Sequence, residues 1–344
     1  MKRVFVITIA SSMFGILYSV VLSEGLSFGL VNGILNGIFI GLLDTIWVRK
    51  RRGRRLRQLP LIHYTLVLTV IWITIILFNM TLTRHWLGLS HDLSLQWMRG
   101  EAFGRHFVFS LFMAFTFNLL LRITSFLGTR SLMEILLGRY QEPAEQHLAF
   151  MFLDVVGSTR LTEKIGDVKT HQLIGNLFFD LAGVVDQYGG EVHRYIGDEM
   201  VVTWDLSKRR SMPDILGCLE DVFRIVEVQR QASVPVYSAW VDLRAGLNSG
   251  LVLVSEVGDL KRELVYFGDT INVAAGLQGH CKEAGVRALI SSSLYQTLEH
   301  APKLHASRLG LVSMKGKIEQ VDSIALAYCE TETTDQDGVT EYTT

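Results

Sequence analysis

Four long apolar stretches dominate the first third of the chain. They cover residues 4–22, 26–48, 60–83 and 105–127. Each is close to the ~20 apolar residues that a helix needs to cross the hydrocarbon core of a bilayer. The first stretch follows a basic start, as a signal peptide would, but no small-residue cleavage site ends it. The pattern therefore predicts a four-helix transmembrane domain over residues 1–127.

From residue 147 the chain changes to short apolar runs separated by amphipathic segments. The runs predict strands near 148–154, 191–195, 199–204, 240–246, 250–256 and 286–291, and helices up to about 187 and near 213–230 and 270–283. Strands and helices in this order predict an α+β, ferredoxin-like (palm-like) domain over residues 147–329. We expect its helices to cover one face of a mostly antiparallel sheet.

Two short segments flank this domain. Residues 128–146 form a predicted amphipathic linker helix, which either pairs with its twin in a dimer or packs on its own domain. The apolar residues on one face of that helix are Leu132, Ile135, Leu136 and Tyr140. Residues 330–344 are polar and acidic, and this composition predicts a disordered tail.

Charge divides the chain in the same way. Residues 1–127 hold 13 of the 33 Lys and Arg residues but only 4 of the 34 Asp and Glu residues. The basic run "RKRRGRRLR" at 49–57 separates the second and third apolar stretches, and such short basic loops stay in the cytoplasm. We therefore expect a multi-pass protein of the inner (plasma) membrane with both termini and the second domain in the cytoplasm.

The same basic run indicates which partners to expect. Between two spans it favours contact with anionic lipid headgroups over binding to a nucleic acid. His63 and His106 lie near opposite ends of the third and fourth spans, too far apart to share one haem. We interpret both histidines as residues of the membrane–water interface.

Two aspartates carry the candidate chemistry. Asp154 ends an apolar strand, and Gly197-Asp198 forms a hairpin tip between two further strands. If these strands are neighbours, the two carboxylates converge, and such a pair repels strongly unless a cation lies between its members. Hard oxygen ligands suit Mg²⁺ or Mn²⁺, and Mg²⁺ often accompanies nucleotide phosphates.

A helix start follows Asp154 directly. The backbone N–H groups at the N-terminus of a helix, together with its dipole, favour phosphate binding. We therefore take Asp154, Asp198 and the backbone of Val155 as candidate metal ligands. The candidate phosphate-binding backbone groups are those of Val156, Gly157, Ser158 and Thr159.

Five ordered motifs resemble the class III nucleotidyl cyclases, and the short linker and four spans resemble their bacterial membrane-anchored members. The motifs are "FMFLDVVGSTRLTEKIGD" (150–167), "GGEVHRYIGDEMVVTW" (189–204), "LRAGLNSGLVLVSEVG" (243–258), "VYFGDTINVAAGLQ" (265–278) and "MKGKIEQV" (314–321). "RYIGDE" is also similar to the signature of the diguanylate cyclases, but "GDTINVAA" has no place in that family.

The resemblance implies a mechanism. In the family, two aspartates, here Asp154 and Asp198, bind two metal ions, and the ribose 3′-oxygen displaces pyrophosphate from the α-phosphorus. The active site is shared across a head-to-tail homodimer. Asn272 matches the asparagine that positions the ribose, and Lys315 matches a lysine that contacts the terminal phosphates.

Three positions depart from the adenylyl cyclase pattern. Arg194 stands where the family has a lysine that reads the base, and Val265 stands where it has the acceptor for the adenine amino group. Gly276 replaces the transition-state arginine. His280 lies one helical turn further on and could supply a compensating donor if protonated.

The resemblance therefore implies an adenylate cyclase that converts ATP to 3′,5′-cyclic AMP and pyrophosphate. Two alternatives stay open because of the three departures. The chain could use GTP or a pyrimidine nucleoside triphosphate, since an arginine fork also suits the edge of guanine. It could instead be a catalytically silent nucleotide-binding or dimerisation module, because Gly276 lacks the catalytic side chain.

Overall fold

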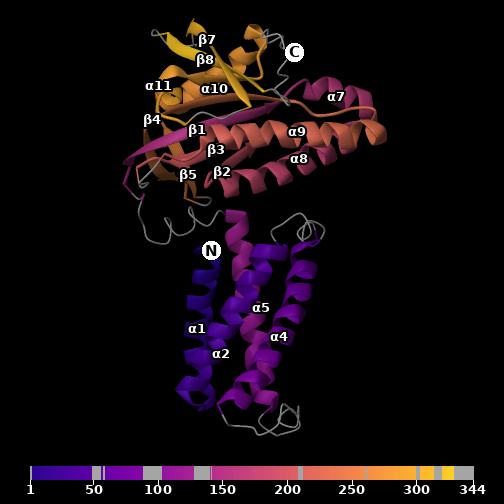
Figure 1. Ribbon diagram of the computed structural model, residues 1–344, viewed down its shortest axis with the longest axis vertical. Helices are drawn as coiled ribbons and strands as arrows, with labels where there is room; N and C mark the ends of the chain where they lie inside the picture. Colours follow the sequence, from indigo (N-terminus) through magenta and orange to yellow (C-terminus); the bar gives the residue numbers. More distant parts are fainter. Residues whose placement is uncertain are drawn as a thin grey trace, which may run out of the picture. The chain divides into compact units, whose positions relative to one another are not determined.

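The computed structural model describes residues 2–48, 56, 59–87, 103–127, 140, 142–207, 212–259, 262–299, 303–313 and 320–328. The chain divides into two compact units, Met1–Thr129 and Arg130–Thr344, and each is described by itself (Figure 1). The predicted disordered tail and most of the predicted linker helix lie outside the described residues.

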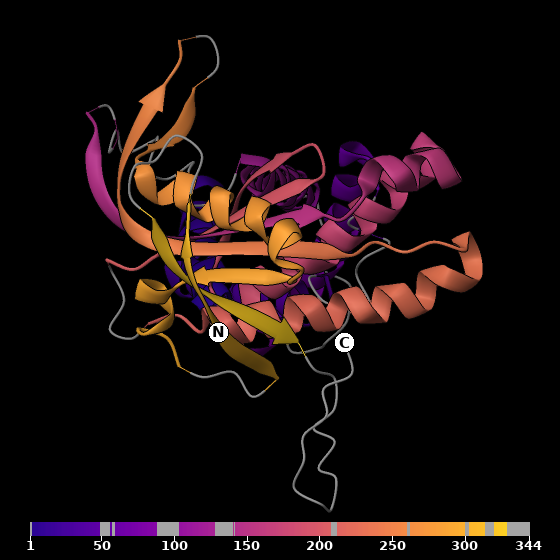
Figure 2. The ribbon, with the colours of Figure 1, turned by 90° about the horizontal axis from the view of Figure 1, so that it is seen from above.

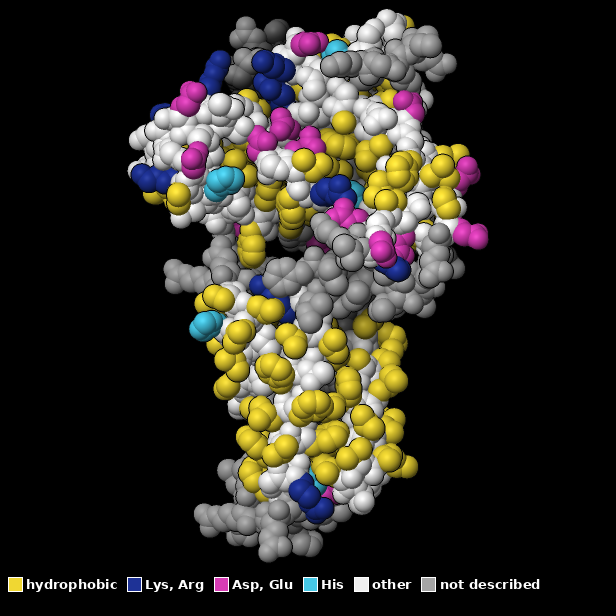
Figure 3. Space-filling model, turned by 180° about the vertical axis from the view of Figure 1, so that it is seen from behind, with side chains coloured by type: hydrophobic (Ala, Val, Ile, Leu, Met, Phe, Trp, Pro, Cys, Tyr) yellow, Lys and Arg dark blue, Asp and Glu magenta, His cyan; other side chains and the backbone are white. Residues whose placement is uncertain are grey.

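The first unit is helical at all four predicted spans. The helices are α1 (Lys2–Leu22), α2 (Leu26–Leu43) with its π-helical continuation η1 (Asp44–Val48), α4 (Leu61–Trp86) and α5 (Phe103–Leu127). Each provides a stretch that is long and apolar enough to cross a membrane. Large hydrophobic side chains such as Val6 and Ile62 point outward, and Figure 3 shows them over the whole visible side of these helices.

Helices α1 and α2 approach each other through glycine. A Cβ atom on Gly15 would lie 2.1 Å from the carbonyl oxygen of Gly29, so no larger residue fits there. Small residues of this kind let helix backbones pack closely in a bilayer, where burial of apolar surface cannot drive association.

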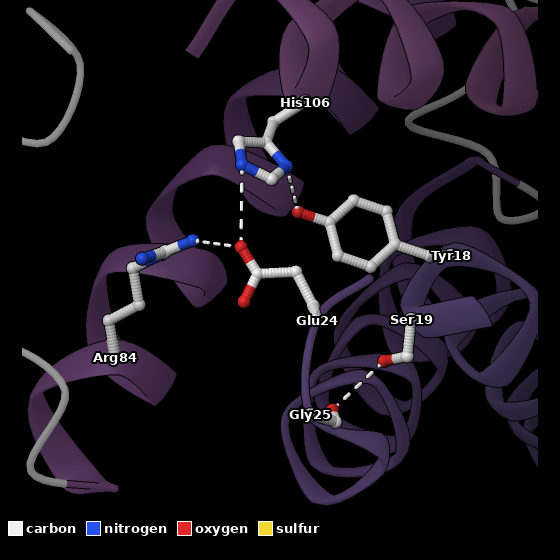
Figure 4. Close-up of polar contacts among 6 residues, drawn as sticks. All are labelled: Tyr18, Ser19, Glu24, Gly25, Arg84 and His106. Carbon is white, nitrogen blue, oxygen red and sulfur yellow. Dashed lines mark hydrogen bonds and ion pairs between the residues drawn. The ribbon is translucent and has the colours of Figure 1, made fainter. Parts of the chain in front are cut away.

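A polar cluster ties three of these helices together near one end of the unit (Figure 4). Arg84 of α4 donates to Glu24, in the turn between α1 and α2, at 2.7 Å, and His106 Nε2 lies 3.4 Å from the same carboxylate oxygen. The Tyr18 hydroxyl is 2.6 Å from His106 Nδ1. His106 is only 4% exposed and packs among the helices, and its place at the membrane–water interface stays a prediction. His63 is exposed at the start of α4.

The second unit is built on one eight-stranded sheet with the order β2-β3-β1-β4-β6-β8-β7, and β5 pairs with β4 beside this path. Among the strand pairs of the described residues, only the β4–β6 pair is parallel. The strands are β1 (Ala144–Val155), β2 (Glu191–Ile196), β3 (Glu199–Asp205), β4 (Leu243–Val257), β5 (Glu263–Phe267), β6 (Ala288–Ser291), β7 (Leu304–Val312) and β8 (Val321–Tyr328). This mixed sheet confirms the predicted fold class.

Helices cover both faces of the sheet, not one face as the sequence led us to expect. The helices are α7 (Ser158–Ile165), α8 (Asp167–Gln187), α9 (Ile215–Tyr237), α10 (Asp269–Ala284) and α11 (Ser292–Tyr295). In β1, Met151 and Leu153 pack in one core with α8 and α9, whereas Phe150 and Phe152 pack in a second core with Ala274 of α10. Figures 1 and 2 show α10 and α9 on opposite sides of β4.

Three further details differ from the sequence prediction. The predicted strands 240–246 and 250–256 are one long strand, β4, which continues through Gly250. Residues 144–146 belong to β1 and not to the linker helix. Tyr140 is 2% exposed, accepts a hydrogen bond from Gln146 and packs in the core of its own domain. For this residue, packing on its own domain is therefore the arrangement found, and not pairing with a twin helix.

Gly246→Ala should destabilise the second unit because α10 crosses β4 directly above this residue. A Cβ atom on Gly246 would lie 2.2 Å from the backbone nitrogen of Gln278 and 2.3 Å from the carbonyl oxygen of Ala274. Overpacking of this kind costs about 1–3 kcal/mol, so the thermal midpoint of the full-length protein should fall by several degrees.

Gly175→Ala provides the matched control. A Cβ atom on this exposed α8 residue would meet no heavy atom within 4 Å, and alanine favours a helix over glycine by about 1 kcal/mol. Its midpoint should be unchanged or higher. A Gly246→Ala protein that unfolds at the wild-type temperature would show that α10 does not pack on β4 as described.

Candidate active site

Asp154 lies near the end of β1, in the middle of the sheet. It is opposite Glu199 of β3 and opposite Arg244 of β4. The preceding residues Phe150–Leu153 are all buried, so the strand is fixed up to the point where the carboxylate emerges. The sequence prediction that this acid ends a buried strand is confirmed.

Asp198 lies beside the end of β1, as its hairpin requires. Gly197 adopts φ +62° at the turn between β2 and β3, a conformation that glycine accepts without strain. The backbone N–H of Val155 donates to the carbonyl oxygen of Asp198 at 3.3 Å. The turn therefore brings Asp198, and Glu199 after it, next to Asp154.

The electrostatics of these three acids reflect their crowding. Burial raises the pKa of Asp154, and the charge of Asp198 raises it further, while Gln278 and Arg244 act in the opposite direction. Burial and the same two aspartates raise the pKa of Glu199 to about 6. The cluster thus holds more negative charge than its surroundings compensate.

These groups are suited to a divalent cation. Two carboxylates and the adjacent backbone carbonyl of Val155 form an oxygen-only donor set of the kind that Mg²⁺ and Mn²⁺ take. Within the described parts of the chain, no group of three or more His, Cys, Asp or Glu residues is arranged to hold a metal by itself. Any ion bound here would therefore complete its coordination with water or substrate oxygens.

The start of α7 provides backbone donors beside the acids. Gly157 adopts φ +67° before the helix, and no side chain caps the first turn. The N–H groups of Ser158 and Thr159 therefore belong to an uncapped helix start. The N–H of Val156 differs, because it already donates to the carbonyl oxygen of Asp242 at 2.9 Å.

Helix α10 contributes to the site from two faces. Gln278 Nε2 donates to Asp154 Oδ2 at 3.1 Å and so orients this carboxylate. Asn272 lies on the exposed face of the same helix, while Val273, Ala274 and Leu277 are buried. The side chain of Asn272 is therefore open to solvent, and within the described residues no hydrogen bond is shown between it and the acids.

The candidate base-reading residues lie on β2 and β5, which are not paired in the sheet. Arg194 of β2 forms an ion pair with Glu263 of β5 at 2.5 Å. Val265, two residues further along β5, lies on the same face of that strand as Glu263. On the opposite face, the ring of Tyr266 lies 4.5 Å from the ring of His193.

Two predicted residues remain, His280 and Lys315. His280 Nε2 lies 2.6 Å from the carbonyl oxygen of Ser313, and Nδ1 lies 3.0 Å from Glu283. Both ring nitrogens are thus engaged locally, and a role toward phosphate would require these contacts to break. Lys315 lies outside the described residues.

Sequence reasoning missed four polar residues of this region: Glu199, Arg244, Glu263 and Gln278. Glu199 could have been found, because it follows Asp198 directly and a hairpin strand begins there. The other three reach the site through strand register and helix packing, for which a single sequence contains no local signal.

Comparisons with known proteins identify the family of this domain. The family model described as "Adenylate and Guanylate cyclase catalytic domain" matches residues 140–327, more than half of the chain. "Adenylate cyclase 2" of Rhizobium meliloti (strain 1021) is 32% identical over 206 residues, which cover 60% of this chain and 57% of that protein. "Receptor-type guanylate cyclase gcy-2" of Caenorhabditis elegans is 29% identical over 168 residues, covering 48% of this chain and 15% of the relative.

Among solved structures, the adenylyl cyclase CyaB from P. aeruginosa is 20% identical with a TM-score of 0.47, and the match covers 55% of this chain and 97% of that one. The chain thus spans little more than half the length of the Rhizobium relative, and a much smaller share of the worm receptor. On the strength of the family match, the chain belongs to the adenylate and guanylate cyclase catalytic domain family.

Proposed function

We propose that the protein is a membrane-anchored adenylate cyclase that converts ATP to 3′,5′-cyclic AMP and pyrophosphate in a head-to-tail homodimer. The observation that carries the proposal is the convergence of Asp154 and Asp198 beside the uncapped start of α7. A catalytically silent module has no need of two crowded carboxylates that raise each other's energy, so this pair favours the active enzyme over the silent alternative.

The residues of the chain have separate roles in the proposed reaction. Asp154, Asp198 and the Val155 carbonyl would hold the cations, and Gln278 keeps Asp154 oriented toward them. The N–H groups of Ser158 and Thr159 would bind phosphate oxygens. When bound, Mg²⁺ or Mn²⁺ would lower the pKa of the ribose 3′-hydroxyl and neutralise phosphate charge.

The bond changes define what the chain must position. The 3′-oxygen loses its proton to solvent and forms a bond to the α-phosphorus, while the bond from that phosphorus to the bridging oxygen breaks and pyrophosphate leaves. Asn272 of the partner subunit would align the ribose for this attack. Its exposed position on α10 is what a residue that serves a second subunit requires.

Base recognition is proposed to use Arg194 together with Glu263. Val265 has no acceptor for the adenine amino group, but Glu263 on the same strand face supplies a carboxylate next to Arg194. Arg194 would donate to a ring nitrogen and Glu263 would accept from the amino group. A donor beside an acceptor also matches guanine and the pyrimidines, so GTP and pyrimidine triphosphates stay as alternatives.

Replacing the metal-binding acids should separate catalysis from folding. Asp154→Asn and Asp198→Asn should each lower kcat by at least ~100-fold, because a bound metal supplies several kcal/mol of transition-state stabilisation. The measurement is the formation of cyclic AMP with Mn²⁺ by membranes that carry the wild-type or the variant chain. In chelator at neutral pH, Asp154→Asn should not lower the thermal midpoint. The pKa of Asp154 is raised, so its protonated form contributes stability at low pH, and this contribution is lost as the pH rises through the folded-state pKa and the carboxyl ionises.

The metal itself gives a second measurement. Mn²⁺ should raise the thermal midpoint of the wild-type protein, since binding to the folded state stabilises it, and this shift should vanish in Asp154→Asn. Glu227→Gln, which removes the half-buried carboxylate partner of the exposed Arg230, is the control and should keep both activity and shift. A folded Asp154→Asn protein with wild-type turnover would contradict the proposed metal site.

Replacing the base-reading pair should change substrate preference. Arg194→Ala and Glu263→Ala should each lower kcat/KM for ATP by about 10–100-fold, because each loses a hydrogen bond to a charged group. Other nucleoside triphosphates should lose less. The ion pair is well exposed, so its loss should leave the domain folded.

The four common nucleoside triphosphates, measured in parallel, decide this prediction. If both variants lower turnover of all four equally, Arg194 and Glu263 do not read the base. If the wild-type protein prefers GTP and the variants lose that preference, the pair is a base reader and the proposed substrate is wrong.

A shared active site predicts complementation between inactive subunits. Asp154→Ala and Asn272→Ala proteins should each be inactive. A co-expressed pair should recover about a quarter of wild-type activity, because half of randomly formed dimers would contain one intact site of two. Differently tagged subunits allow mixed dimers to be isolated and assayed. Isolated mixed dimers without activity would argue against a site that two subunits share.

A further inference from the structure

The four-helix unit contains a cavity of about 90 Å³ that the proposed cyclase function does not use. Helices α1, α2, α4 and α5 all contribute to its wall, and none of the lining residues carries a charge. An ionic ligand is excluded by this wall, since an unpaired charge in such surroundings is costly. The cavity is therefore suited to an uncharged molecule.

Five aromatic rings form a large part of the apolar wall. Phe14, Tyr18, Trp72, Phe109 and Phe117 all line the cavity. The ring of Phe117 contacts those of Phe14 and Trp72, with centroids 5.6 and 5.7 Å apart. Rings that pack against one another in this way have few alternative rotamers, so the wall keeps its shape without a ligand.

The polar cluster of Figure 4 fixes one of these rings. The Tyr18 hydroxyl lies 2.6 Å from His106 Nδ1, and His106 lies against Glu24, which also accepts from Arg84. The hydroxyl of Tyr18 is thus already engaged with His106, while Tyr18 lines the cavity. The charged members of this cluster, Glu24 and Arg84, do not line the cavity.

Polar side chains in the wall are left with hydrogen-bonding capacity. Asn79 donates to Asn36 at 2.7 Å, and Asn36 donates to Asn32 at 2.6 Å. This relay ends at the amide group of Asn32, which lines the cavity and is 6% exposed. The carbonyl oxygen of Asn79, at the other end, is buried without a partner.

Ser110 adds a second polar group to the wall. Several hydroxyl groups of these helices donate to the carbonyl oxygen four residues earlier, as Ser12 does to Thr8. Ser110 lines the cavity and is 4% exposed, yet its hydroxyl forms no hydrogen bond with any residue that the structure describes. Buried polar groups normally have partners, so this hydroxyl and the Asn32 amide indicate a missing one.

We propose that this cavity binds a small uncharged amphiphile, with an apolar body no larger than one six-membered ring and one hydrogen-bonding group such as a hydroxyl. The volume sets this upper limit, because the cavity is smaller than an apolar cavity of about 150 Å³ that admits benzene in another protein. The aromatic rings contact the apolar body, and Ser110 with Asn32 binds the polar group.

The test uses two probes of equal size that differ in the polar group. 4-Fluorophenol has the hydroxyl and 4-fluorotoluene has a methyl group in its place. Their fluorine NMR signals are titrated with the full-length protein in lipid nanodiscs, and empty nanodiscs measure partition into lipid. We expect saturable binding of 4-fluorophenol to the protein, and binding of 4-fluorotoluene that is weaker by about two- to tenfold, the value of one hydrogen bond.

Three variants identify the site. Ala114→Leu fills the cavity and should abolish saturable binding of both probes, since Ala114 lines it. Ser110→Ala should weaken 4-fluorophenol by about two- to tenfold and leave 4-fluorotoluene unchanged. Ser12→Ala removes a hydroxyl that is already bonded within α1, and it should change neither probe.

The results decide the proposal whether or not Ala114→Leu folds. Absence of saturable binding in the wild-type protein would overturn it, and so would binding that Ala114→Leu and Ser110→Ala leave unchanged. If Ala114→Leu unfolds, the loss of preference for 4-fluorophenol in Ser110→Ala still supports the site, and an unchanged preference overturns the assignment of its polar group. None of these results depends on cyclase activity.

Discussion

Burial of β1 on both faces is the constraint on which the second unit depends. Alternate residues of this strand enter two separate cores, one with α8 and α9 and one with α10. A strand so enclosed cannot shift its register by one residue without exchanging the two cores. The position of Asp154 at its end is therefore fixed before any ligand binds. The β2–β3 hairpin and α10 reach this carboxylate because each packs on β1 or on its neighbours.

The sequence predicted those parts of the site that depend on local pattern. The apolar run before Asp154, the Gly197-Asp198 turn and the helix start after Gly157 lie where their spacing indicates. From the sequence, the two acids were expected to converge only if their strands were neighbours. The register shows that β1 and β3 do pair. In contrast, the partners Gln278 and Glu263 lie 124 and 69 residues from the side chains that they contact. Such contacts depend on the curvature of the whole sheet.

Errors in the predicted fold have the same origin. Helices were expected on one face because a continuous apolar run does not by itself distinguish one buried face from two. The two predicted strands on either side of Gly250 are one strand. Gly250 marks a close approach of Thr270 to the strand, since a Cβ atom there would lie 2.6 Å from the Thr270 hydroxyl oxygen, and not a break in the strand. His106 could not be identified as buried because its partners, Tyr18 and Glu24, come from another helix and from a turn.

Charge balance couples the metal and the nucleotide in the proposed active site. Asp154, Asp198 and Glu199 lie close together, and Arg244 is the basic residue that faces Asp154 across the β1–β4 pair. A nucleoside triphosphate adds several negative charges to this region. Gly276 provides no cationic side chain to offset them. Without cations, the negative charge that already raises the pKa of Asp154 and Glu199 would oppose the binding of the nucleotide. The retained acid cluster therefore makes sense only if nucleotide binds together with cations, and the missing arginine increases this dependence because less of the compensating charge comes from the protein.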